Sequence, residues 1–185
     1  MMLTACTMTV KRHYLEPSGA GVNATNNVES VNDEAGALKT AGIIHLASDV
    51  TLQLQSHSNE AESVSLLIRL PPGRSFRFSH PTVVLRSGGE QATISPTWRV
   101  LVRKDGHVRM QDFPFDTELS ESLERGVRKV ERPPAFSAVI RLPPTFRNKP
   151  TFTLELPGAA DGAEPVVVHF ERKYAEYRQR VRQLQ

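Results

Sequence analysis

The chain of 185 residues has one cysteine, and apolar residues never run on for long. A single thiol excludes a disulfide within the chain and leaves no cysteine cluster for a structural zinc site. No stretch of about 18 apolar residues occurs, so the sequence predicts no transmembrane helix. The formal net charge is only +3, without the concentrated basic face that a nucleic-acid-binding module needs. We therefore expect no nucleic-acid partner.

Familiar catalytic signatures are also missing. The sequence contains neither the G-x-S-x-G elbow of serine hydrolases nor the glycine-rich loops that hold phosphates. The six histidines are scattered, so each is predicted to lie at the surface and no metal site is expected. Asp112 and Asp116 flank Phe113-Pro114-Phe115, where a turn with solvated carboxylates is favoured over a calcium site. We predict no enzymatic activity, no cofactor and no small-molecule substrate.

Residues 43–170 alternate between apolar and polar side chains. A period of two is typical of strands with one buried face, and it favours antiparallel sheets because parallel sheets give unbroken apolar runs. Asp105-Gly106 joins two alternating runs and predicts a two-residue hairpin. The clearest runs cover residues 50–55, 64–70, 76–78, 98–103, 136–142, 152–156 and 166–170.

These strands predict a mainly β protein, an antiparallel two-sheet sandwich of immunoglobulin or transthyretin type over residues 43–170. Trp98, in the middle of a run, is expected in its core. A short helix is expected between the sheets, because Leu119, Leu123, Val127 and Val130 fall at helical spacing. A bent strand over residues 126–132 is the open alternative.

The pentapeptide IRLPP occurs twice, at residues 68–72 and 140–144. Two interpretations are open. The copies can form a pseudo-symmetric pair of loops on one surface, or two strands can simply end alike because proline cannot donate to a ladder. The second interpretation is favoured, since a five-residue match is weak.

The two flanks have different compositions. Residues 7–42 are rich in small and polar residues without a sustained period, which predicts a flexible tether. Residues 171–185 carry five basic and two acidic side chains. Tyr174, Tyr177, Val181 and Leu184 recur there at helical spacing and predict a basic amphipathic α-helix.

Two groups of residues are candidates for contact with a partner. Phe113 and Phe115 flank a rigid proline. If they are exposed, they form a contact patch; the favoured interpretation is that they are buried and close one end of the sandwich. The basic side of the C-terminal helix would suit an acidic partner or an anionic membrane, although packing of the helix on the sandwich is favoured. Its candidate residues are Arg172, Lys173, Arg178, Arg180 and Arg182.

The only cysteine follows an aliphatic residue and two small residues, in the order Leu3-Thr4-Ala5-Cys6. This stretch resembles the lipobox of bacterial lipoproteins, in which small residues leave the backbone open to a peptidase and the thiol accepts a lipid. The resemblance implies a diacylglycerol on Cys6, cleavage before it, and acylation, for example with palmitate, of the new amino group. Residues 1–6 are then the remnant of a signal peptide whose apolar region lies upstream of Met1. The residue after the cysteine is Thr7 and not aspartate. In lipoproteins of enteric-type bacteria this implies sorting to the outer membrane.

The expected function is that of a membrane-anchored periplasmic lipoprotein whose sandwich is a protein-binding or structural module of the cell envelope. Two alternatives are open. A carbohydrate- or cell-wall-binding module would expose aromatic side chains such as Trp98 and Phe113. A cytoplasmic, non-lipidated adaptor is expected if Met1 is the true start and Cys6 is incidental.

Overall fold

The computed structural model is mainly β, and every pair of neighbouring strands is antiparallel, as predicted. The structure describes residues 6–19, 22–25, 39–46, 49–57, 62–124, 135–160 and 162–181.

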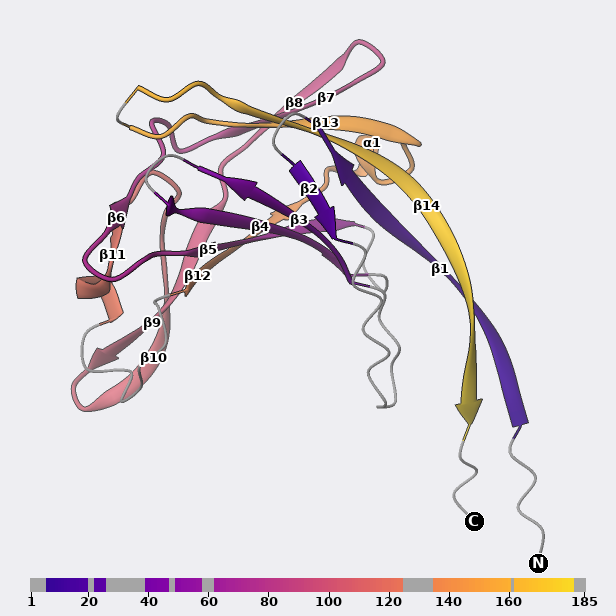
Figure 1. Cartoon of the computed structure of the whole chain (residues 1–185), viewed down its shortest axis with the longest axis horizontal. Helices are drawn as coiled ribbons and strands as arrows, with labels where there is room; N and C mark the ends of the chain where they lie inside the picture. Colours follow the sequence, from indigo (N-terminus) through magenta and orange to yellow (C-terminus); the bar gives the residue numbers. More distant parts are fainter. Residues whose placement is uncertain are drawn as a thin grey trace, which may run out of the picture.

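Two main sheets form the two layers seen in Figure 1. The five-stranded sheet has the order β1 (Cys6–Ser18), β14 (Val166–Val181), β13 (Thr151–Leu156), β7 (Val83–Ser87) and β8 (Glu90–Ile94). The seven-stranded sheet has the order β10 (His107–Pro114), β9 (Thr97–Lys104), β12 (Ala135–Arg141), β5 (Ser63–Arg69), β4 (Thr51–His57), β3 (Lys39–His45) and β2 (Val22–Thr25). A small sheet pairs β11 (Leu119–Ser120) with β6 (Ser75–Phe76).

One hydrophobic core lies between the two main sheets. Leu66 and Ile68 of β5 and Leu154 and Val168 of β13 and β14 are fully buried in the same cluster. The alternation in the sequence therefore marks inward-facing residues, and the predicted sandwich-like arrangement of antiparallel sheets is confirmed at this level. Burial of these apolar faces is the main force that holds the layers together.

Trp98 lies in this core, as predicted. Its side chain is 0% exposed, and its Nε1–H donates a hydrogen bond of 2.8 Å to the carbonyl oxygen of Phe115. The Trp98 ring stacks on Phe115 with centroids 4.9 Å apart, and Phe115 stacks on Phe78 at 4.6 Å. The bond satisfies the one polar group of the indole, so the tryptophan is buried without an unpaired donor.

The two IRLPP copies lie on neighbouring antiparallel strands, because Ile68 of β5 is opposite Phe136 and Ile140 of β12 is opposite Val64. The strands run in opposite directions, so their proline ends leave the sheet at opposite ends. The copies therefore do not form one surface, and the favoured interpretation, two strands that end alike, is confirmed.

The described part of the connection after β10 contains a short strand and a 3-10 helix where an α-helix was predicted. Leu119 belongs to β11, and a 3-10 helix, η2 (Glu121–Glu124), follows it. Val127 and Val130 of the predicted helix lie outside the described residues. One helical turn that the sequence analysis did not predict, α1 (Pro144–Arg147), begins with Pro144 in its first turn, where proline is tolerated because its missing N–H would have no helical partner.

The prediction of a flexible tether over residues 7–42 is wrong for most of its described part. β1 reaches Ser18, β2 covers Val22–Thr25, and β3 begins at Lys39. The side chain of Leu15 is fully buried, and its backbone N–H donates a hydrogen bond of 3.1 Å to Ser56 Oγ of β4. Pairing with β14 and burial of Leu15 offset the entropy of ordering this segment. Residues 26–38 lie outside the described residues.

The predicted C-terminal helix is also wrong, because β14 continues as a strand to Val181. It pairs with β13 as far as Glu171, and from Arg172 onward its described partner is β1, up to the pair Val181–Cys6. Residues three apart lie on opposite faces of a strand, so Tyr174 and Tyr177 do not share the predicted stripe. Residues 182–185 lie outside the described residues.

Residues 6–15 of β1 and 172–181 of β14 together form a two-stranded arm. Figure 1 shows the arm running away from the two layers, and the pair Cys6–Val181 lies at its far end. At about 3.3 Å per residue, ten pairs extend for about 30 Å.

Candidate functional site

One edge of the seven-stranded sheet is formed by β10 and its neighbour β9, which we call the edge ribbon. They pair from Lys104–His107 to Thr97–Pro114. Asp105 and Gly106 join them with φ angles of 53° and 78°, which confirms the predicted two-residue hairpin, because its type I′ turn requires positive φ at both residues. β12 pairs with β9 only opposite Arg99 and Trp98. The far half of the ribbon therefore extends beyond the rest of the sheet.

An apolar patch lies on the outer face of the edge ribbon. It consists of Leu101, Val108 and Met110, whose exposed fractions are 36%, 46% and 59%. Met110 is directly opposite Leu101, and Val108 is opposite Arg103. These three are half of the six large hydrophobic side chains that are exposed in the described part of the chain. Such clustering at one place is typical of a contact surface.

Arg99, Arg103 and Asp112 lie on the same face of the edge ribbon as the apolar patch. Residues 97–114 contain four Arg or Lys side chains and two Asp side chains, a formal charge of +2. Arg99 lies 3.9 Å from Asp112 across the strands, with both side chains more than half exposed, so this pair contributes little to stability. Arg103 donates to the carbonyl oxygen of Gly106 at 3.5 Å. Arg109 makes no ion pair with the described part of the chain, so its charge is available to a partner.

β10 is also the last strand of its sheet. All its residues except Phe113 are exposed, and among the described strands none lies on the other side of its backbone. Unpaired N–H and C=O groups on an edge strand are a template for another strand, and natural proteins normally protect them. On β10 the described residues that protect the edge are its charged side chains and Pro114 at its end, and the apolar patch lies beside this edge.

The aromatic candidates are placed differently. Phe115 is 0% exposed and belongs to the core, whereas Phe113, opposite Trp98, is partly buried against the core. Phe115 therefore plugs the sandwich and offers no contact patch. A carbohydrate-binding face built on Trp98 has no structural basis, because that ring is fully buried.

The basic candidates of the C-terminal segment do not form one helical face. Lys173 forms ion pairs with Glu16 and, at 3.4 Å, with Glu171, and the hydrogen bond to Glu16 is the main reason that the pKa of Lys173 is raised. Arg172 donates to the carbonyl oxygen of Lys149 at 3.3 Å; burial lowers its pKa, and the charge of Glu62 opposes this shift. Arg178 and Arg180 lie in the arm opposite Thr9 and Thr7. Arg182 lies outside the described residues.

Cys6, the candidate lipid attachment residue, is the first residue of β1 and is opposite Val181 at the far end of the arm. Leu3, Thr4 and Ala5 lie outside the described residues.

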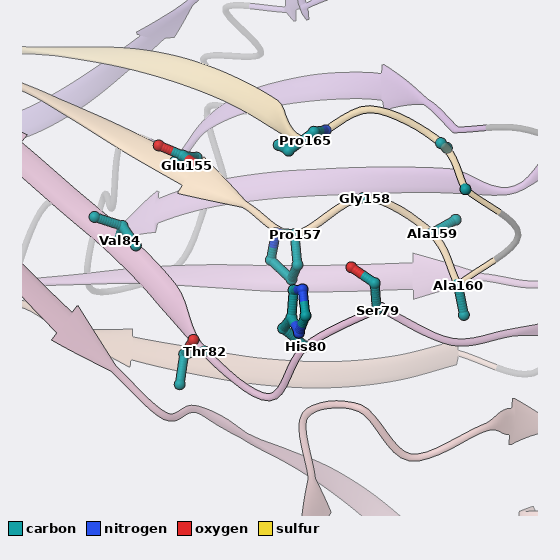
Figure 2. A pocket seen from close by; sticks show the side chains of 12 residues that line it. Ser79, His80, Thr82, Val84, Glu155, Pro157, Gly158, Ala159, Ala160 and Pro165 are labelled. Carbon is teal, nitrogen blue, oxygen red and sulfur yellow. The ribbon is translucent and has the colours of Figure 1, made fainter.

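Figure 2 shows a hollow beside the loops that follow β6 and β13, with Ser79 and His80 among its lining residues. The Ser79 N–H donates a hydrogen bond of 2.9 Å to the carbonyl oxygen of Gly158. A Cβ on Gly158 would lie 1.7 Å from the Ala163 carbonyl oxygen, so the close approach of two segments within the β13–β14 connection requires glycine. Glu155, another lining residue, contacts Arg86 at 3.5 Å. Among the described residues, no carboxylate is hydrogen-bonded to the side chain of Ser79 or His80, so those that line the hollow do not form a serine–histidine–carboxylate arrangement.

The side chains of five histidines are exposed, as predicted: His13, His45, His80, His107 and His169. In the described part of the chain, no three His, Cys, Asp or Glu side chains lie close enough to hold a metal ion.

No protein-family model, curated protein or solved structure matches the chain. Among the described residues, no helix has the length and apolar character to cross a membrane.

Proposed function

We propose that this protein is a non-enzymatic binding module of the bacterial cell envelope, and that a partner protein docks on its edge ribbon. The observation that carries the proposal is the apolar patch of Leu101, Val108 and Met110 beside the open edge of β10. Main-chain hydrogen bonds along such an edge supply affinity, and neighbouring side chains supply specificity. The patch adds apolar surface that leaves water when a partner binds.

We also propose that a lipid on Cys6 holds the module on the periplasmic face of the membrane, with the outer membrane as the expected location. The LTAC stretch supports this proposal, and so does the position of Cys6 at the far end of the arm. An attachment point there would leave about 30 Å between the lipid and the two sheets. The arm thus replaces the flexible tether as the spacer, and two or more acyl chains would make the attachment stable.

Site-specific photo-crosslinking in the native cell tests the docking surface. A benzophenone amino acid replaces Met110 in the full-length protein, and a control replaces Val167, which is 42% exposed on β14. We expect a discrete protein adduct from position 110 and none from position 167. No adduct from position 110, or the same adducts from both positions, would contradict the proposed docking surface.

Metabolic labelling with an alkyne analogue of palmitate tests the anchor. The gene is expressed from its own locus with its upstream sequence, and Cys6→Ser is compared with the natural protein. We expect label and membrane association for the natural protein and loss of both in Cys6→Ser, because serine keeps the size of the side chain but lacks the thiol. A natural protein without label would refute lipidation.

A further inference from the structure

We infer that the edge ribbon accepts an added β-strand of another protein in which apolar residues alternate with acidic residues. This inference rests on the proposed function and names the class of partner. It follows from the backbone of β10 and from the different chemistry of its two faces.

The backbone sets the length and conformation of the bound segment. Residues 107–113 of β10 contain no proline, and Pro114 ends the strand. Along a strand, every second residue directs its N–H and C=O toward the same side. Seven residues at about 3.4 Å each provide about 24 Å of open edge. An extended segment of six or seven residues is therefore the unit that fits.

The outer face of β10 sets every second position of that segment. Val108 and Met110 lie on this face with exposed fractions of 46% and 59%, and the third residue of the face, Asp112, lies 3.9 Å from Arg99 of β9. Side chains of an added strand on the same face would stand about 5 Å from them, the usual distance between cross-strand neighbours. Apolar side chains at these positions would remove the patch from water, and the flexible Met110 thioether adapts to different shapes.

The opposite face sets the remaining positions. His107, Arg109 and Gln111 lie there, opposite Lys104, Val102 and Val100 of β9. All three side chains on β10 are exposed, and Arg109 is charged without an ion-pair partner in the described part of the chain. Opposite charges on neighbouring strands attract and like charges repel. Acidic side chains at these positions of the added strand therefore complement this face.

A second copy of this chain fits the edge less well. Two edge ribbons would each bring a formal charge of +2 and would place two copies of Arg109 near each other. The acidic residues Glu121 and Glu124 lie nearby in η2, which contacts β9. Glu121 already accepts a hydrogen bond of 3.3 Å from the Gly73 N–H. The charge of the ribbon thus favours an acidic partner over self-association.

Fluorescence anisotropy with three labelled seven-residue peptides tests the inference on the full chain. The first peptide alternates Val and Glu, the second alternates Val and Lys, and the third contains the residues of the first with the valines adjacent. We expect the Val/Glu peptide to bind at least tenfold more tightly than either of the others. Equal binding of the three peptides would overturn the inference.

Charge reversal gives the sharper test. Arg109→Glu should invert the preference, so that the Val/Lys peptide binds more tightly than the Val/Glu peptide. The control Arg74→Glu makes the same charge change at an exposed residue outside the ribbon and should leave the preference unchanged. An inverted preference cannot come from misfolding, since misfolding would weaken both peptides. An unchanged preference in Arg109→Glu would refute the role of this face.

The outcomes separate the two proposals. An adduct at position 110 together with equal binding of all peptides would leave the docking surface in place and overturn the alternating strand. No adduct and no peptide binding would overturn both. A dimer in analytical ultracentrifugation that Met110→Lys dissociates would overturn the heterologous partner in favour of a second copy.

Discussion

Leu15 offers the clearest test of the fold, because composition predicts a flexible tether at this position and the structure buries it. The side chain is 0% exposed, and the backbone N–H of Leu15 is hydrogen-bonded to Ser56 Oγ. Leu15→Ala removes three carbon atoms from a packed site. In a tether, the same substitution would remove side-chain atoms from water at no cost in stability.

The expected cost follows from the burial. Replacing a buried leucine by alanine lowers the free energy of unfolding by about 2–5 kcal/mol, from lost transfer energy and from the cavity left behind. For a chain of this length, each kcal/mol lowers the melting temperature by about 2–4 °C. We therefore expect the Leu15→Ala melting temperature to fall by at least about 4 °C.

Tryptophan fluorescence provides the assay, because the chain has one tryptophan and Trp98 is fully buried. Its emission reports exposure of the core during urea or thermal unfolding. Tyr174→Ala is the matched control, since Tyr174 is 66% exposed near the base of the same arm; its free energy of unfolding should change by less than about 0.5 kcal/mol. If Leu15→Ala and Tyr174→Ala have the same unfolding midpoint, β1 does not pack on the core.

Three further substitutions test other parts of the structure. Ser56→Ala removes the hydroxyl that accepts a hydrogen bond from the buried Leu15 N–H and should cost about 1 kcal/mol in urea unfolding, whereas Ser75→Ala at an exposed residue should be nearly neutral; equal midpoints would contradict the bond. Gly158→Ala places a Cβ 1.7 Å from the Ala163 carbonyl oxygen, so the β13–β14 connection must move and the melting temperature should fall; an unchanged melting temperature would show that Gly158 and Ala163 are not this close. Lys173→Met removes an ammonium group whose pKa is raised above its ordinary value of 10.5 by Glu16. The stabilisation that corresponds to a raised pKa is fully present below the pKa of the unfolded state. It is lost as the pH rises through the pKa of the folded state. The difference in melting temperature between Lys173→Met and the natural protein should therefore be present at pH 7 and shrink at pH 11, and a constant difference would refute the ion pairs.

The central strands could be predicted because their signal is local. Leu66 and Ile68 alternate with residues of the other face. This alternation indicates a strand with one face in the core. The Asp105-Gly106 turn could also be predicted, since two residues with positive φ favour this dipeptide. The edge ribbon was therefore visible in the sequence as a hairpin. Its role as an open edge was not, because exposure depends on which strands lie beside it.

The two ends of the chain show why local patterns are not sufficient. The spacing of Tyr174, Tyr177 and Val181 fits one side of a helix, yet these residues lie in a strand. Antiparallel pairing with β1, up to Cys6 opposite Val181, supplies backbone partners that no local window contains. The same pairing turns the predicted tether into β1. Each segment is a strand because the other segment is beside it.

The sequence by itself determined the class of the fold, the inward faces of the central strands, the hairpin turn and the lone thiol in a lipobox-like stretch. These features depend on side-chain period and backbone preference, which neighbouring residues decide. Only the tertiary structure decided that the two ends form an arm, that Phe115 is buried, and that Leu101, Val108 and Met110 meet beside an unpaired strand. Those features depend on contacts between segments far apart in the chain, where burial and hydrogen bonding override local propensity.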